Sequence, residues 1–335
     1  MAALATTEKV LLVILFVSDL VAAQNRLSPC YDSQKRPLRC EPIFSNPAFG
    51  LPIEATNTCG ELVRTDPYGQ FYGPLKLESF RRFYRQTGAT GATKDSDYSG
   101  HNKTWWQSIT LYEYKEREIG DMVQASITLH LGKAFDITYI RLIFHSPRPE
   151  SFSIWKKTTD TSDWEPYQYY SASCLSTFNV PQDGIIDTPT RAICTREYTH
   201  ISPLSGGNVA FSTLDNRPNA YEFDRNKLLQ EFVTATAIQI RLRRLNTFGD
   251  EVFEDTSVLQ SYYYAVSEIS VGGKCKCNGH ANECVQTNSL DGNSRLVCQC
   301  QHNTTGPDCN QCLRTHNDKP WAPATILDAN VCQGQ

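Results

Sequence analysis

The 335-residue chain lacks an apolar run long enough to cross a bilayer. The run Val10–Val17 contains eight residues, whereas a membrane-spanning helix needs about twenty. Lys9 precedes this run and the small residues Val21-Ala-Ala23 follow it, as in a secretory signal peptide over residues 1–23. We therefore expect a secreted chain without membrane insertion, whose thirteen cysteines pair in an oxidising compartment.

The chain also lacks an excess of positive charge. Its formal net charge is -4, and its longest basic cluster is Arg241-Leu-Arg-Arg244. Nucleic-acid binding requires a basic patch or stripe that neutralises phosphates. No nucleic-acid partner is therefore expected.

Catalytic motifs are absent as well. The sequence contains no Gly-x-Ser-x-Gly, His-Glu-x-x-His or phosphate-binding glycine loop. None of its seven histidines forms a close pair of ligands. An enzyme is not expected, but a glycan-binding module stays open as an alternative, because β-sandwiches often serve as lectin domains.

Short segments of alternating apolar and polar residues recur upstream of residue 275. Their apolar members are Ile127, Leu129 and Leu131; Ile140, Leu142 and Phe144; Phe152 and Ile154; and Ile238, Ile240 and Leu242. A period of two places such side chains on one face of a strand. With turn residues between the segments, the pattern predicts a mainly β fold, an antiparallel sandwich of two sheets.

One short helix is expected from Asp224 to Phe232. Asp224 is a suitable N-cap residue, and Leu228, Leu229 and Phe232 share one helical face. This helix would pack that face against the sandwich.

Several aromatic residues of the large domain could form an exposed contact patch, but aromatics at strand spacing more often lie in the core, so the core is expected. They include Trp105, Trp106, Trp155 and the consecutive tyrosines Tyr262 to Tyr264. Because successive residues of a strand point to opposite faces, at least one of the three tyrosines is expected outside the main core.

Cysteines are concentrated near the C-terminus. Five fall in residues 24–274 and eight in residues 275–332. So short a segment cannot bury enough apolar surface to fold by packing alone, and disulfides of about 2–4 kcal/mol each are expected to stabilise it. The alternative is a zinc site, since Cys-x-Cys and Cys-x2-Cys are ligand spacings; the secretory signal disfavours it. Spacing alone does not fix which cysteines pair.

The stretch from Tyr262 to Cys284, with Gly272-Gly-Lys-Cys-Lys-Cys-Asn-Gly-His280 at its centre, resembles the junction of a laminin N-terminal domain with a laminin EGF-like module. Residues His302-Asn-Thr-Thr-Gly-Pro-Asp-Cys309 and Asn46-Pro-Ala-Phe49 extend the likeness. The resemblance implies a jelly-roll β-sandwich over residues 24–274 and a small disulfide-rich EGF-like module over residues 275–332.

Disulfides follow from the same resemblance. It implies four pairs in the module: Cys275 with Cys284, Cys277 with Cys298, Cys300 with Cys309, and Cys312 with Cys332. In the large domain, Cys174 is expected to pair with Cys194 and Cys30 with Cys40. Cys59 is then left without a partner.

Two further segments, Thr104-Trp-Trp-Gln-Ser108 and Leu131-Gly-Lys-Ala-Phe-Asp-Ile-Thr138, look most like laminin gamma chains. The resemblance implies a secreted protein of the extracellular matrix and basement membrane. Its N-terminal domain would bind the N-terminal domains of laminin alpha and beta chains in network assembly and cell adhesion, with cell-surface receptors as further partners. The alternative is a netrin-like guidance ligand, because netrins share the same two-domain start.

The sequence departs from the family between Cys59 and Trp105. Family members carry several cysteines there, whereas this chain has none, and about twenty expected residues are missing after Lys94. A laminin chain also needs a long heptad region to trimerise. None is present, so an amino-terminal fragment or truncated form is expected.

No cofactor is expected apart from a structural calcium ion that the resemblance implies. Its ligands would come from Asp97, Thr104 and Ser267, since calcium prefers hard oxygen ligands. Two glycosylation sequons begin at Asn102 and Asn303.

Overall fold

The computed structural model describes residues 29–59, 64–65, 71–72, 105–116, 124–288 and 294–334. The chain divides into two compact units: Phe44–Cys275, and Met1–Ile43 together with Lys276–Gln335. The expected signal peptide and the segment after Lys94 lie outside the described residues. No helix within the described ranges has both the length and the apolar character of a membrane span.

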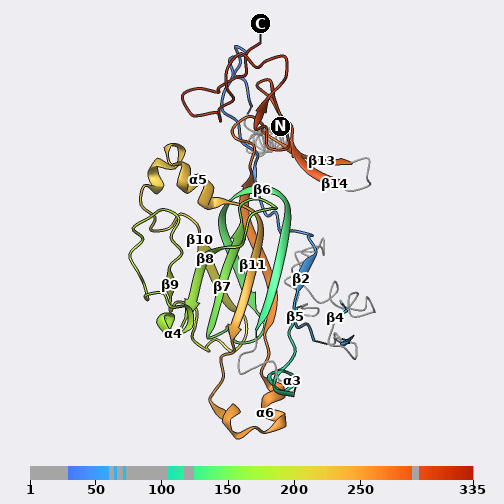
Figure 1. Ribbon diagram of the computed structural model, residues 1–335, viewed down its shortest axis with the longest axis vertical. Helices are drawn as coiled ribbons and strands as arrows, with labels where there is room; N and C mark the ends of the chain where they lie inside the picture. Colours follow the sequence, from blue (N-terminus) through green and yellow to red (C-terminus); the bar gives the residue numbers. More distant parts are fainter. Residues whose placement is uncertain are drawn as a thin grey trace, which may run out of the picture. The chain divides into compact units, whose positions relative to one another are not determined.

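The larger unit is built mainly from strands, and its helices are short (Figure 1). Its strands are β1 (Phe44–Ser45), β2 (Ile53–Ala55), β3 (Arg64–Thr65), β4 (Phe71–Tyr72), β5 (Trp106–Gln107), β6 (Ala125–Phe144), β7 (Ser151–Lys157), β8 (Glu165–Ser171), β9 (Cys194–Thr195), β10 (Gly207–Ser212), β11 (Thr234–Arg244) and β12 (Ala265–Cys275). Its helices are α3 (Leu111–Glu116), α4 (Cys174–Phe178), α5 (Lys227–Val233), α6 (Thr256–Ser261) and the 3-10 helices η1 (Ala220–Arg225) and η2 (Asp250–Phe253). The mainly β prediction is confirmed.

Strand β6 connects the two layers of the sandwich, because its two halves have different neighbours. Residues 125–130 pair with β11, and β2 lies on their other side. Residues 139–144 pair instead with β10 and β12. Between the halves, Gly132 has a φ of 72°, a left-handed conformation that glycine adopts without steric cost. One long strand thereby contributes to both layers.

The layer that contains β11 continues outward through antiparallel β7 and β8 to the short parallel strand β9. The opposite layer is completed by β1 and β5, which both pair with β12. All the alternating residues named from the sequence are buried: Ile127, Leu129, Leu131, Ile140, Leu142, Phe144, Phe152, Ile154, Ile238, Ile240 and Leu242. The period-two pattern therefore identified the inner faces of both layers.

The expected helix exists, but its start and its buried face differ from the prediction. The side chain of Asn226, not Asp224, caps α5 by accepting a hydrogen bond from the backbone N–H of Leu229 at 3.2 Å. Leu228 is 54 % exposed. Because α5 begins at Lys227, the side chains that face the sandwich are Leu229, Phe232 and Val233.

The three consecutive tyrosines lie between α6 and β12, outside any strand, and one of them is less buried than the others, as expected. Tyr262 and Tyr264 are buried, whereas Tyr263 is only partly covered. Among the tryptophans, Trp106 is buried, but Trp105 and Trp155 are half-buried. The expected place in the core is therefore found for Trp106 and not for Trp105 or for Trp155, whose ring lies on the outer face of the β7 layer.

The smaller unit contains β13 (Cys284–Asn288), β14 (Ser294–Cys298), β15 (Thr304–Thr305) and β16 (Gln311–Cys312). They form two short antiparallel pairs. The described residues from 29 to 43 also belong to this unit. This grouping differs from the expected boundaries of 24–274 and 275–332, because the backbone N–H of Cys40 donates to the carbonyl oxygen of Gly279 at 3.0 Å.

Candidate functional site

Disulfides hold the smaller unit together. The structure joins Cys277 with Cys298, Cys300 with Cys309, and Cys312 with Cys332. Cys275 and Cys284 are disulfide-bonded as well. Cys30 pairs with Cys40 in the same unit. In the larger unit Cys174 pairs with Cys194, and Cys59 carries an exposed free thiol. The disulfides of the smaller unit thus crosslink strands, β13 to β16, that are short and form little core of their own.

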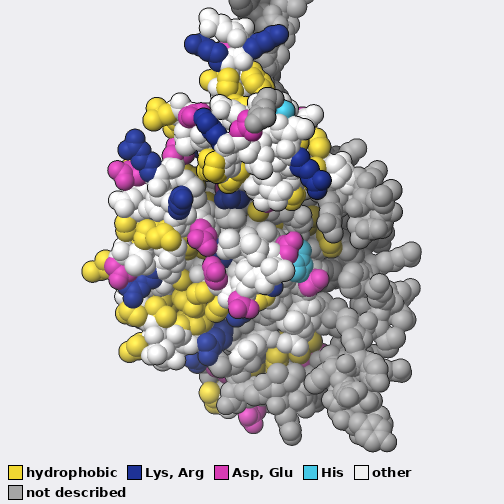
Figure 2. All heavy atoms as spheres, turned by 45° about the horizontal axis from the view of Figure 1, so that its top comes forward, with side chains coloured by type: hydrophobic (Ala, Val, Ile, Leu, Met, Phe, Trp, Pro, Cys, Tyr) yellow, Lys and Arg dark blue, Asp and Glu magenta, His cyan; other side chains and the backbone are white. Residues whose placement is uncertain are grey.

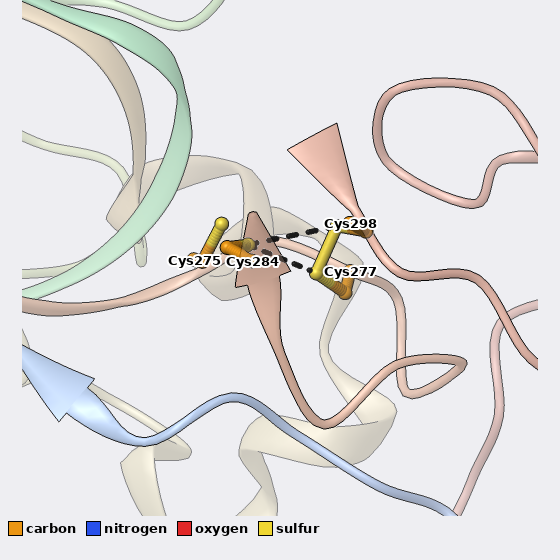
Figure 3. A group of neighbouring side chains, drawn as sticks. All are labelled: Cys275, Cys277, Cys284 and Cys298. Atoms are coloured by element: carbon orange, nitrogen blue, oxygen red, sulfur yellow. Dashed lines mark hydrogen bonds between the residues drawn. A yellow bond between two sulfur atoms is a disulfide. The ribbon is translucent and has the colours of Figure 1, made fainter. Parts of the chain in front are cut away.

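Four of these sulfur atoms lie close enough together to suggest a metal centre. The sulfurs of Cys275, Cys277, Cys284 and Cys298 are within 4.8 Å of one another. Figure 3 shows the Cys277–Cys298 bond beside Cys284, whose sulfur lies 3.5 Å from that of Cys277. Zinc binds cysteine as the thiolate. Because all four cysteines are oxidised, this cluster is a structural crosslink.

Two buried histidines connect residues 29–43, called the N-terminal loop below, with the EGF-like module. The Nδ1 atoms of His280 and His302 lie 3.1 Å apart. The outer nitrogen of His280 contacts the carbonyl oxygen of Ala322 at 3.0 Å, and that of His302 contacts the carbonyl oxygen of Cys30 at 3.1 Å. Both rings are fully buried, so this chain of contacts links residues about 270 positions apart in the sequence.

The larger unit carries a groove of about 970 Å³ on the outer face of the β7, β8 and β11 layer. Trp155, Tyr169 and Phe178 supply its aromatic wall, and Arg241 and Arg243 supply its charge. Small polar side chains such as Ser126, Ser153, Ser176 and Thr177 complete the lining. No Asp or Glu lines this groove, which is therefore a positively charged, aromatic surface on a chain of net negative charge.

Strand pairing explains how the cation reaches the aromatic ring. Trp155 of β7 lies opposite Gln239 of β11, so Arg241 is its diagonal neighbour on the same face. The guanidinium carbon of Arg241 lies 3.9 Å from the centroid of the Trp155 ring. Its Nε donates to Oε1 of Gln239 at 2.6 Å. Burial lowers the pKa of Arg241, and the nearby Tyr169 opposes that shift.

A second cation and two more rings extend this arrangement. The ring of Tyr169 packs edge-on to Trp155 at 6.1 Å and lies 4.8 Å from Phe178 at the end of α4. The guanidinium carbon of Arg243 lies 5.3 Å from the Phe178 ring. Its Nε is buried without a hydrogen-bond partner among the described residues. Burial also raises the pKa of Tyr169, so its hydroxyl is neutral at physiological pH.

The face of the molecule drawn in Figure 2 carries side chains of both charges. In the view of Figure 2, hydrophobic side chains gather at several places among both basic and acidic ones, and neither sign of charge dominates the described surface on that face. This agrees with a sequence whose longest basic cluster has four residues, Arg241-Leu-Arg-Arg244. The groove stands out because both of its charged side chains are cations.

Only one of the three expected calcium ligands lies among the described residues. Asp97 and Thr104 lie outside the described residues. Ser267 sits in β12 at a shift of register between Val266 and Glu268, and its hydroxyl donates to the carbonyl oxygen of Ile143 at 3.1 Å. The three residues are not shown to converge.

Only one of the two glycosylation sequons lies among the described residues. Asn102 lies outside the described residues. Asn303 is half-buried, and its Nδ2, the atom that would carry a glycan, donates to the carbonyl oxygen of Cys332 at 2.9 Å. A glycan there would have to share that nitrogen with a structural hydrogen bond.

The groove was not found by sequence reasoning. The sequence marks Arg241 and Arg243 only as part of a short basic cluster, and for Trp155 it favours the core over an exposed contact patch. The usable signal was the alternation Arg241-Leu-Arg243, which places both arginines on the face opposite the buried Leu242. Tyr169 and Phe178 come from β8 and α4, and no sequence pattern brings them to β11.

Comparison with known proteins matches both parts of the chain. The model of the laminin N-terminal domain (domain VI) matches residues 40–273, and that of the laminin EGF domain matches residues 275–326. Laminin-like protein lam-2 of Caenorhabditis elegans is 47% identical over 327 residues, which cover 91% of this chain and 19% of lam-2. Human laminin subunit gamma-1 is 47% identical over 347 residues, which cover 96% of this chain and 20% of that subunit. The chain thus spans about a fifth of the length of these relatives.

Among solved structures, a chitosan-binding module from a Paenibacillus chitosanase/glucanase aligns with a TM-score of 0.31 at 12% identity. The alignment covers 68% of this chain and 98% of that module. A likeness of this size carries no argument about ligands.

Proposed function

Because the chain belongs to the laminin N-terminal domain family, as a secreted protein of the basement membrane related to gamma subunits, we propose that it takes part in assembly of the laminin network. Its proposed partners are the N-terminal domains of laminin alpha and beta chains. The gamma-type relatives make this assignment the first choice over a netrin-like receptor ligand.

The observation that carries the proposal is the groove on β7, β8 and β11. Its lining combines half-buried aromatic rings with two arginines, and aromatic residues and arginine are enriched in protein–protein contacts. Trp155, Tyr169 and Arg241 are each held by neighbours on the sheet. Little rotamer freedom is therefore lost when a partner binds, which favours association.

The relatives are structural proteins of the laminin family, and we propose that this chain has no catalytic activity. Calcium binding through Asp97, Thr104 and Ser267 also remains a proposal. A calcium ion that binds only the folded state raises its stability. Thermal unfolding of the secreted chain with and without calcium tests it: a melting temperature that does not change argues against the site.

Direct binding tests the proposed partners. The secreted chain is mixed with purified N-terminal domains of a laminin alpha and a laminin beta chain and examined by analytical ultracentrifugation. A complex containing all three components is expected, because the proposed network contact is formed by one N-terminal domain from each of the three chains. If the chain sediments alone at every concentration while binding a cell-surface receptor, the netrin-like alternative is supported instead.

A further inference from the structure

We propose that the groove binds an acidic segment of a partner N-terminal domain, with a carboxylate held between Arg241 and Arg243. This inference rests on the proposed role in assembly of the laminin network. An apolar side chain next to that carboxylate would lie against Trp155 and Tyr169. The ligand class is therefore a short protein segment in which Asp or Glu adjoins an aromatic or aliphatic residue.

The charge of the groove is the first argument. No carboxylate among the described residues forms an ion pair with Arg241 or Arg243. The next arginine of the same strand, Arg244, is by contrast paired with Glu150 at 3.2 Å. Partly buried guanidinium groups are normally compensated by an anion, so the two groove arginines leave a place for an external one.

Geometry is the second argument. Arg241 and Arg243 are two residues apart on one face of β11, which separates their Cα atoms by about 7 Å. Arg241 lies over the Trp155 ring and donates from Nε to Gln239, and both arginines line the groove. Planar guanidinium groups bind carboxylates well through paired N–H donors.

The aromatic wall is the third argument. Trp155, Tyr169 and Phe178 form a continuous series of ring contacts at 6.1 and 4.8 Å. A free sulfate or phosphate would use the arginines but not these rings. A peptide segment uses both, because its neighbouring apolar side chain is removed from water against the rings.

Charge also separates a protein segment from a sulfated polysaccharide. A polyanion gains affinity from many cations in a row, whereas the groove supplies two, and the chain carries a net charge of -4. Long-range repulsion therefore disfavours a polyanion. A single carboxylate with an apolar neighbour experiences far less of it.

A peptide pair tests the groove directly. The probes are a blocked Gly-Phe-Glu-Phe-Gly peptide and its Glu-to-Gln counterpart, titrated at millimolar concentration into the secreted chain. Binding is followed by the NMR signal of the Trp155 indole N–H. We expect saturable shifts with the Glu peptide and at least tenfold weaker binding of the Gln peptide. Equal binding of the two peptides, or no shift at Trp155, would overturn the proposal.

Variants connect the groove with the partner domains. Arg241→Gln and Arg243→Gln are each expected to weaken the complex with alpha and beta N-terminal domains at least tenfold, and Arg241→Lys less. Arg244→Gln is the matched control, since it removes a cation from the same strand outside the groove. The affinity of this variant for the alpha and beta N-terminal domains should stay unchanged. Melting curves verify that each variant is folded.

The outcomes separate the two proposals. If the unaltered chain binds the partner domains and both groove variants bind equally well, the groove proposal fails and the function stands. If the chain binds no partner domain but still prefers the Glu peptide, the function fails and the groove chemistry stands. If heparin fragments bind the groove more tightly than the Glu peptide and shift Trp155, the protein-segment proposal is overturned.

Discussion

Arg241 places its guanidinium carbon 3.9 Å from the centre of the Trp155 ring, across the pairing of β11 with β7. The indole N–H of Trp155 donates to the hydroxyl of Ser153 at 2.9 Å, and Ser153 lies directly opposite Arg241 in the same ladder. The pairing register of two strands therefore fixes both the ring and the cation. A contact surface built on paired strands is more rigid than one built on loops.

A buried arginine, Arg217, joins the loop that follows β10 to the loop that precedes β9. Arg217 donates from Nε to the carbonyl oxygen of Thr213 at 2.9 Å and from Nη1 to those of Pro189 and Arg191 at 2.9 and 2.8 Å. Its guanidinium carbon lies 3.8 Å from the ring of Phe232. Burial lowers the pKa of Arg217 to about 10, so it remains charged at neutral pH.

We predict that Arg217→Met lowers the free energy of unfolding of the larger unit by about 2–4 kcal/mol, because one buried and two partly buried carbonyl groups lose their donor. Urea unfolding followed by tryptophan fluorescence measures this loss. The matched control is Arg244→Met, an exposed ion pair for which about 0–1 kcal/mol is expected. An equal loss of unfolding free energy in the two variants would show that the hydrogen bonds of Arg217 stabilise the larger unit no more than an exposed ion pair does.

The N-terminal loop is predicted to stabilise the module. Cys30 and Cys40 close a loop of ten residues in sequence separation, and disulfides of this kind contribute about 2–3 kcal/mol. The double variant Cys30→Ala, Cys40→Ala should therefore speed hydrogen exchange in residues 276–334. Cys59→Ser, which removes the exposed free thiol, is the control. Unchanged exchange in the double variant would mean that the module folds independently of the loop.

Acid is predicted to weaken the contacts of the buried His280 with His302 and with the Ala322 carbonyl. Burial, with a smaller contribution from the neighbouring His302, lowers the pKa of His280, although its contact with the Ala322 carbonyl opposes the shift. The unfolded chain therefore takes up the proton first, at about pH 6.5. Stability is present above that pH and is lost as the pH falls toward the lower folded-state pKa.

Hydrogen exchange in residues 276–334 at pH 7.5 and 5.5, corrected for intrinsic rates, measures this effect. The acid-induced increase in the native chain should shrink in His280→Gln, which cannot titrate. His200→Gln alters an exposed histidine and should leave the increase intact. A full acid response in His280→Gln would exclude His280 as its source.

Glycosylation is predicted at one sequon of the two. Nδ2 of the half-buried Asn303 is engaged by the Cys332 carbonyl, whereas Asn102 lies in the polar sequence Asp97 to Lys103, where a glycan can stay in water. Mass measurement of the secreted chain before and after N-glycosidase should show loss of one glycan. Asn102→Gln should abolish that loss and Asn303→Gln should not. The reverse pattern would contradict the assignment.

Sequence reasoning succeeded where local periodicity decides the structure. Ile127, Leu129 and Leu131 alternate with polar residues, and β6 buries them because a strand alternates its faces. It failed at Leu228, since the choice of Asn226 over Asp224 as the cap depends on a single side-chain hydrogen bond. That choice turns the helix and exposes a leucine that the pattern had buried.

The groove and the N-terminal loop could not be predicted for a different reason. Phe178 reaches Arg243 only after α4 has packed beside β8. His302 contacts the Cys30 carbonyl across 272 sequence positions. Such contacts depend on the whole topology, and neither hydrophobic period nor cysteine spacing encodes them locally.

The central claim is that this chain occupies a contact site of the laminin network. Sedimentation of polymerising laminin in the presence of rising amounts of the 335-residue chain tests it most directly. The added chain supplies one N-terminal domain without the multivalency that joins network arms, so it should fill contact sites and reduce the pelleted polymer in a dose-dependent manner. The Arg241→Gln variant should inhibit less. An undiminished pellet at a large molar excess of the chain would contradict the account.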